Sequence, residues 1–106
     1  MKISIITATL NSEKVLNDCL DSIATQKHNN IEHIIIDGAS TDGTLNIIKK
    51  RKKQPKIIVS EKDNGIYDAM NKGIRYATGD IIGFLNSDDF YVNNNILSRV
   101  SDIFEE

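Results

Sequence analysis

Short isoleucine-rich stretches alternate with amphipathic helical stretches four times along this chain, and this alternation restricts its fold more than any other feature. β-branched runs bounded by polar turns predict strands at 3–7, 31–37, 56–60 and 80–85. Apolar residues at helical spacing predict helices at 15–23, 42–53, 66–77 and 96–104. The alternation predicts right-handed crossovers and an α/β fold, namely an open, Rossmann-like parallel sheet with helices on both faces.

Polar loops follow the predicted strands at the point where each strand ends. They lie at 7–11, 37–44, 60–65 and 86–89. The carboxyl ends of parallel strands share one edge of the sheet, and open α/β sheets bind ligands at that edge. The four loops therefore predict a ligand cleft.

The composition is that of one small globular domain, which we assign to residues 1–106. Hydrophobic residues make up 40% and charged residues 26% of the chain. The net charge of −2 creates no general attraction for nucleic acid, so no nucleic-acid partner is expected. The single cysteine, Cys19, excludes an internal disulfide, fits a reducing compartment and is expected to be a core residue.

No apolar run approaches the length of about 18 residues that a membrane span needs. The first apolar stretch is interrupted by Ser4, Thr7 and Thr9, so we interpret it as a buried strand and not as a signal peptide. These features favour a cytoplasmic protein. The basic run at 49–53 is interpreted as a solvated helix end, where cations favour the helix dipole.

Asp88 and Asp89 are adjacent carboxylates that directly follow a predicted buried strand. Their mutual repulsion and loss of hydration would favour a bound cation, and hard oxygen ligands suit Mn²⁺ or Mg²⁺. Such a metal would neutralise the charge of a departing diphosphate. The alternative is that one aspartate caps the helix near Asn93 while the other is solvated. The placement beside three other polar loops favours the metal site.

Asp37 ends the second predicted strand and has two interpretations that remain open. It accepts hydrogen bonds from a nucleotide, or it fixes the turn that follows. Ser40 and Thr41 are expected to serve the start of the next helix, with Gly43 easing the turn.

The stretch at 63–73 begins with Asp63-Asn64-Gly65, whose amides at a helix start are candidates to hold a phosphate or a sugar hydroxyl. Ala69 and Gly73 fall on the apolar side of this helix, where small residues allow close packing on the sheet. The two histidines, at 28 and 33, lack metal-site spacing and are expected in turns or at the surface.

Four motifs in this order resemble those of the family 2 glycosyltransferases, which have the GT-A fold, and in particular the bacterial polysaccharide-synthesis type. They are the sequences SIITATLN at 4–11, IDGASTDGT at 36–44, DNGIYDAMNKG at 63–73 and TGDIIGFLNSDD at 78–89. The resemblance covers essentially the whole chain, but only the N-terminal, nucleotide-sugar-binding half of such a domain. The expected fold is therefore a truncated GT-A sheet, with the first strand between the second and fourth and the third at the outer edge.

The resemblance implies a hexosyltransferase-type enzyme that binds a nucleotide-diphosphate sugar, with a UDP-sugar favoured, together with Mn²⁺ or Mg²⁺. Asp89 would bind the metal, and Asp88 would contact the metal or the ribose. Asp37 matches the first of two family aspartates, and Gly38 stands in place of the second. The candidate nucleotide-sugar-binding residues are Thr9, Asn11, Asp37, Asp63, Asn64 and Asp88.

The family's catalytic base and acceptor-binding helix have no counterpart in these residues, so the catalytic residues are unassigned. We expect that the full-length enzyme glycosylates a saccharide or lipid-linked acceptor in polysaccharide biosynthesis, at the cytoplasm or the inner-membrane periphery. The 106-residue chain alone is expected to be inactive in transfer and to self-associate through the sheet edge or the helix at 93–106.

The alternative is a non-catalytic nucleotide-binding or oligomerisation module. A phospho-receiver domain would need an acidic pair after the first strand, where Thr7-Ala8-Thr9 stands. A dinucleotide oxidoreductase would need a glycine-rich loop there, and residues 7–12 contain no glycine.

Overall fold

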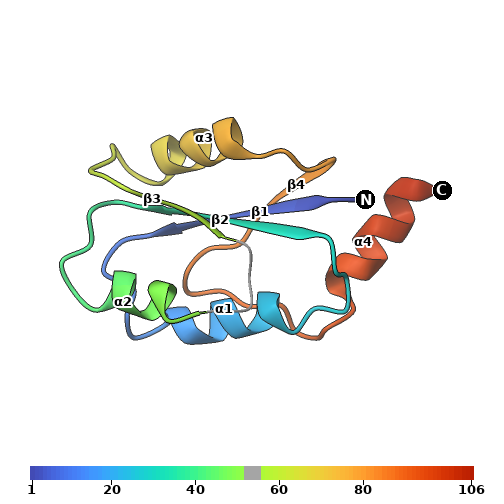
Figure 1. Cartoon of the computed structure of the whole chain (residues 1–106), viewed down its shortest axis with the longest axis horizontal. Helices are drawn as coiled ribbons and strands as arrows, with labels where there is room; N and C mark the ends of the chain where they lie inside the picture. The colour runs from blue at the N-terminus through green and yellow to red at the C-terminus, as the bar shows by residue number, and fades with distance from the viewer. Residues whose placement is uncertain (52–55) are drawn as a thin grey trace.

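A computed structural model describes residues 1–51 and 56–106 and shows four strands alternating with four helices (Figure 1). The strands are β1 (Ile3–Thr9), β2 (Ile31–Asp37), β3 (Lys56–Ser60) and β4 (Ile81–Phe84). The helices are α1 (Leu16–Ala24), α2 (Thr44–Lys49), α3 (Ile66–Tyr76) and α4 (Ile96–Glu105). All eight predicted elements are confirmed.

The strands form one parallel sheet in the order β3-β2-β1-β4, as predicted. Ile6 of β1 pairs with Ile34 of β2 and with Phe84 of β4. Because every strand runs the same way, the loops after β1, β2, β3 and β4 all leave from the same edge of the sheet.

Helices cover both faces of the sheet, with α3 on one side and α1 and α2 on the other (Figure 1). Ile3, Ile5 and Ile35 pack with Leu16 of α1 and Ile48 of α2. Burying such side chains contributes roughly 1.5–3 kcal/mol each. Cys19 is fully buried in the same cluster, as expected.

On the other face, Ile6, Ile34 and Ile36 pack against Ala69 of α3. Gly73 lies so close to the sheet that a Cβ there would stand 2.4 Å from Cγ2 of Ile6. The small residues of α3 therefore permit close packing on the sheet, as the sequence predicted.

The second helix is shorter than the predicted 42–53, because it begins only at Thr44 and ends at Lys49. Of the basic run, Lys52 and Lys53 lie outside the described residues. Arg51 forms an ion pair with Asp21 of α1 and donates a 2.8 Å hydrogen bond to Oδ1 of Asn17. This part of the basic run is therefore engaged with α1.

The expectation that both histidines lie in turns or at the surface is wrong for His33. Its ring is fully buried in β2, and its Nε2 lies 2.9 Å from the hydroxyl of Thr7 on β1. A neighbouring-strand hydroxyl satisfies the ring inside the sheet. No helix within the described ranges is long and apolar enough to cross a membrane.

Candidate functional site

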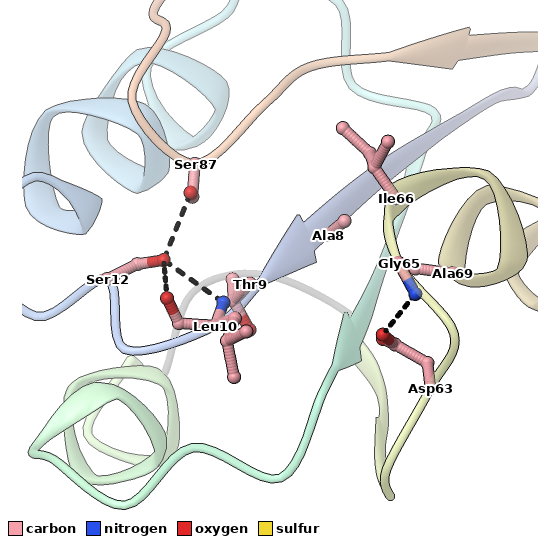
Figure 2. Close-up of a pocket in the computed structure, with 9 residues that line it drawn as sticks. All are labelled: Ala8, Thr9, Leu10, Ser12, Asp63, Gly65, Ile66, Ala69 and Ser87. Carbon is pink, nitrogen blue, oxygen red and sulfur yellow. Dashed lines mark hydrogen bonds between the residues drawn. The ribbon is translucent and has the colours of Figure 1, made fainter.

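A cavity of about 280 Å³ opens at the carboxyl edge of the sheet, between the end of β1, the start of α3 and the loop after β4 (Figure 2). Its lining comes from three segments that are far apart in the sequence. The lining residues are Ala8, Thr9, Leu10, Ser12, Asp63, Gly65, Ile66, Ala69 and Ser87. The cavity lies at the predicted edge but is lined from the loops after β1, β3 and β4, and no residue of the loop after β2 lines it. Its lining is mainly apolar with a few polar groups, as in small-molecule sites.

Asp37 ends β2 at this edge of the sheet, with its side chain fully buried. Its Oδ1 accepts hydrogen bonds from Thr9 Oγ1 (2.6 Å) and Ser40 Oγ (2.5 Å). Its Oδ2 accepts from the Ser40 amide (2.8 Å) and from Ser60 Oγ (2.9 Å). Burial alone would raise the pKa of Asp37, but these hydrogen bonds outweigh it and hold the pKa below its usual value. The structure thus shows Asp37 in the turn-fixing role, joining the ends of β1, β2 and β3.

Asn11 links the loops after β1 and β2. Its Oδ1 accepts a 2.8 Å hydrogen bond from the amide of Thr41, and its backbone takes the left-handed conformation (φ 48°) that asparagine tolerates. The start of α2 is served by Asp42, whose Oδ1 accepts the Thr44 amide at 2.9 Å. The expectation that Ser40 and Thr41 serve this helix is therefore wrong, because they face Asp37 and Asn11.

Ser12 connects three loops at the cavity. Its amide donates to Oγ1 of Thr44 (2.8 Å), and its hydroxyl donates to Oγ of Ser87 (3.1 Å; Figure 2). The loop that carries Asp88 and Asp89 is thereby tied to the end of β1 one residue before the aspartate pair.

Asp88 and Asp89 are both exposed, so the expected loss of hydration is absent. Neither caps α4, whose first turn is served by Gln26 Oε1, an acceptor for the Leu97 amide (3.1 Å). In the part of the chain that the structure describes, neither carboxylate has a side-chain partner, and no group of three or more His, Cys, Asp or Glu side chains gathers as a metal site. The pair offers two carboxylates and leaves the remaining ligands to come from elsewhere.

The backbone amides of the residues before α3 donate hydrogen bonds to nearby aspartate side chains. The Asn64 amide donates to Oδ2 of Asp68 (2.9 Å), and the Gly65 amide donates to Oδ1 of Asp63 (3.1 Å; Figure 2). These amides are engaged by side chains, so the idea that they hold a phosphate is not supported by this arrangement. Position 65 requires glycine, since the backbone φ there is 106°, which other residues rarely adopt.

Of the predicted nucleotide-sugar-binding residues, Thr9 and Asp63 line the cavity. Asp37 is buried and does not line it, while Asn11, Asn64 and Asp88 are exposed on the surrounding loops. Sequence reasoning did not select Ser12 and Ser87, although Ser87 stands in one of the polar loops that it identified and Ser12 directly follows another. Their roles depend on the contact between two loops, which no sequence spacing reveals.

The sequence model of Glycosyl transferase family 2 matches residues 4–105. The chain belongs to this family. It is 45% identical over 101 residues to a PGL/p-HBAD biosynthesis glycosyltransferase of Mycobacterium bovis, covering 92% of this chain and 40% of that protein. An uncharacterized glycosyltransferase of Haemophilus influenzae is 39% identical over 102 residues, which are 93% of this chain and 41% of that protein. The family 2 chain described here thus spans about 40% of the length of these relatives.

Solved structures share its fold. TarS of S. aureus, residues 1–349 in complex with UDP-GlcNAc, superposes with a TM-score of 0.93 at 31% identity, covering 99% of this chain and 31% of that 1–349 chain. The mannosyltransferase PcManGT of Pyrobaculum calidifontis, in complex with GDP-Man and Mn²⁺, superposes with a TM-score of 0.91 at 24% identity, covering 99% of this chain and 32% of that one. The four-stranded parallel sheet is the GT-A sheet that the resemblance implied.

Proposed function

We propose that this chain is the part of a family 2 glycosyltransferase that binds a nucleotide-diphosphate sugar, with UDP-sugars favoured. The observation that carries the proposal is the cavity itself, which places Thr9, Asp63 and Ser87 around one space beside the Asp88–Asp89 loop. TarS, at 31% identity, was solved with UDP-GlcNAc, and also with UDP at 32% identity, which supports a uridine nucleotide.

The proposed metal is Mn²⁺ or Mg²⁺, held by Asp89 with Asp88. The donor set fits such an ion, because both carboxylates are exposed and have no side-chain partner among the described residues. A partial protein shell leaves positions for phosphate oxygens. When bound, the ion would stabilise the negative charge of the diphosphate leaving group.

In the full-length enzyme, the proposed acceptor is a saccharide or a lipid-linked saccharide in polysaccharide biosynthesis, at the cytoplasmic side of the inner membrane. Glycosyl transfer needs a base within hydrogen-bond reach of the acceptor hydroxyl. No residue around the cavity is assigned that role, so we expect the 106-residue chain alone to bind the donor and not to transfer the sugar.

Calorimetry with UDP and GDP, each with and without Mn²⁺, tests this function. Binding should be stronger with Mn²⁺, and Asp89→Ala should abolish the difference. Asp102→Ala, an exposed carboxylate on α4, is the matched control and should leave it unchanged. Metal-dependent binding that persists in Asp89→Ala would refute the metal assignment.

The alternative function is a non-catalytic nucleotide-binding or oligomerisation module. A transfer assay with UDP-GlcNAc separates this module from the enzyme. For the assay, the chain replaces the matching segment of a full-length family 2 protein. Transfer supports the enzyme, whereas nucleotide binding without transfer supports the module.

A further inference from the structure

Among the described residues that line the cavity, Asp63 is the one with a charged side chain. Its neighbours there are small, apolar or hydroxyl-bearing. The cavity volume of about 280 Å³ lies just below the range of roughly 300–1,000 Å³ for small-molecule sites. A space of this size and lining suits a flat heterocycle that makes few polar contacts.

The position of the Asp63 carboxylate depends on Gly38, which follows β2. A Cβ on Gly38 would lie 3.0 Å from Oδ2 and 3.4 Å from Cγ of Asp63. The glycine therefore leaves room for the carboxylate, and a longer side chain at position 38 would compete with Asp63 for the same space. The carboxylate of Asp63, from the loop after β3, thus occupies the space that a side chain at position 38 would fill.

The two oxygens of Asp63 are in different situations. Oδ1 accepts the hydrogen bond from the Gly65 amide, while Oδ2 receives no donor from the described residues. A carboxylate accepts hydrogen bonds and donates none. Oδ2 is thus an acceptor left for a donor group of a ligand.

We infer that Asp63, seated over Gly38, selects the nucleobase of the donor. The inference rests on the proposed nucleotide binding. A carboxylate attracts a base with a ring N–H, as in uracil and guanine. It repels a base with a ring lone pair in the equivalent place, as in cytosine. Sites built around such a hydrogen bond reject the wrong partner strongly, because a polar group is left unpaired.

Calorimetry with UDP, GDP and CDP in Mn²⁺ tests the inference. The chain should bind UDP or GDP at least about tenfold more tightly than CDP, and whichever binds better identifies the base. In Asp63→Ala the ratio of the Kd for CDP to the Kd for the better-bound nucleotide should fall to near one. Asp63→Asn retains the shape and adds a donor, so its affinity for CDP should rise relative to the unaltered chain.

The competition between positions 38 and 63 has its own test. Gly38→Asp should weaken UDP or GDP binding by crowding Asp63. The double variant Gly38→Asp with Asp63→Ala should recover the preference over CDP, because one carboxylate again occupies the shared space. A double variant that is weaker than either single variant would overturn the shared-space argument.

The remaining outcomes separate this inference from the proposed function. Equal affinities for UDP, GDP and CDP, or a preference that survives in Asp63→Ala, would overturn base selection by Asp63 and leave nucleotide binding intact. Failure of every nucleotide to bind would overturn the proposed function, and base selection with it.

Discussion

The hydroxyl of Thr9 donates a 2.6 Å hydrogen bond to Oδ1 of Asp37, so that the last residue of β2 is joined to a residue of β1 that lines the cavity. The two residues are also paired in the sheet register. Ser60, at the end of β3, completes the arrangement from the other side. A buried carboxylate therefore holds three strand ends together at the edge of the sheet that carries the cavity.

Asp37→Ala should destabilise the fold by about 3 kcal/mol, because it removes a fully buried charged acceptor and leaves the buried hydroxyl of Thr9, together with the hydroxyls of Ser40 and Ser60, without their partner. Denaturant unfolding measures the change. Asp88→Ala, at an exposed carboxylate, is the control and should stay within about 0.5 kcal/mol of the unaltered chain. A neutral Asp37→Ala would show that the carboxylate does not hold the strand ends.

Gly73→Ala should destabilise the chain by about 1–3 kcal/mol, because the added methyl would press on the buried side chain of Ile6. Asn71→Ala, on the exposed side of the same helix, should be neutral or slightly stabilising, since alanine favours helix formation. Thermal unfolding of both variants checks this prediction. Equal stabilities would mean that α3 does not pack closely on β1.

Glu32 should make stability depend on pH at the opposite edge of the sheet. Burial would raise its pKa, but hydrogen bonds from Thr78, Lys2 and Ser4 outweigh that and lower the pKa from 4.5 to about 2. Because the folded pKa is the lower one, the contribution is complete above about pH 4.5 and is lost as the pH falls toward about 2. It amounts to at most roughly 3 kcal/mol.

Glu32→Gln should therefore reduce stability at pH 7 and flatten its dependence on pH between about 5 and 2. Denaturant unfolding across this range gives the comparison, with Glu106→Gln at an exposed position as the control. Parallel curves for Glu32→Gln and the unaltered chain would contradict the role of this carboxylate.

The free edge of the sheet should promote self-association. Ile82 and Phe84 of β4 are 41% and 43% exposed, and pairing with Ile6 places Phe84 on the face where α3 covers β1 and β2. β4 pairs with β1 on one side only, and exposed apolar groups on such an edge strand favour contact with another chain. Light scattering should show dimers or larger species, which Phe84→Ser should reduce. A strict monomer at all concentrations would contradict this prediction.

The fold was predictable because the isoleucine-rich strands and the apolar helix faces carry their own periodicity. The start of α2 was harder to place, since Asp42 and Gly43 are common both in turns and at the start of a helix. The hydrogen bond from the Thr44 amide to Asp42 shows that the helix begins at Thr44. The alternation of elements also predicted a parallel sheet whose polar loops share one edge, at the carboxyl ends of the strands.

The site was predictable only to the level of loops. Asp37 had two equal interpretations, and the choice depended on Thr9 and Ser60, whose contacts arise from strand register. Gly38 and Asp63 are close although α2 and β3 lie between them in the sequence, so no local spacing indicates this contact.

The most direct test of the central claim is the location of bound nucleotide and metal on the chain. In amide NMR spectra, UDP with Mg²⁺ should shift the signals of Gly65 and Ser87, which line the cavity. Replacement of Mg²⁺ by Mn²⁺ should broaden Asp89 most strongly, because paramagnetic broadening falls steeply with distance. Effects strongest at Glu32 and Thr78, at the opposite edge of the sheet, would contradict the site.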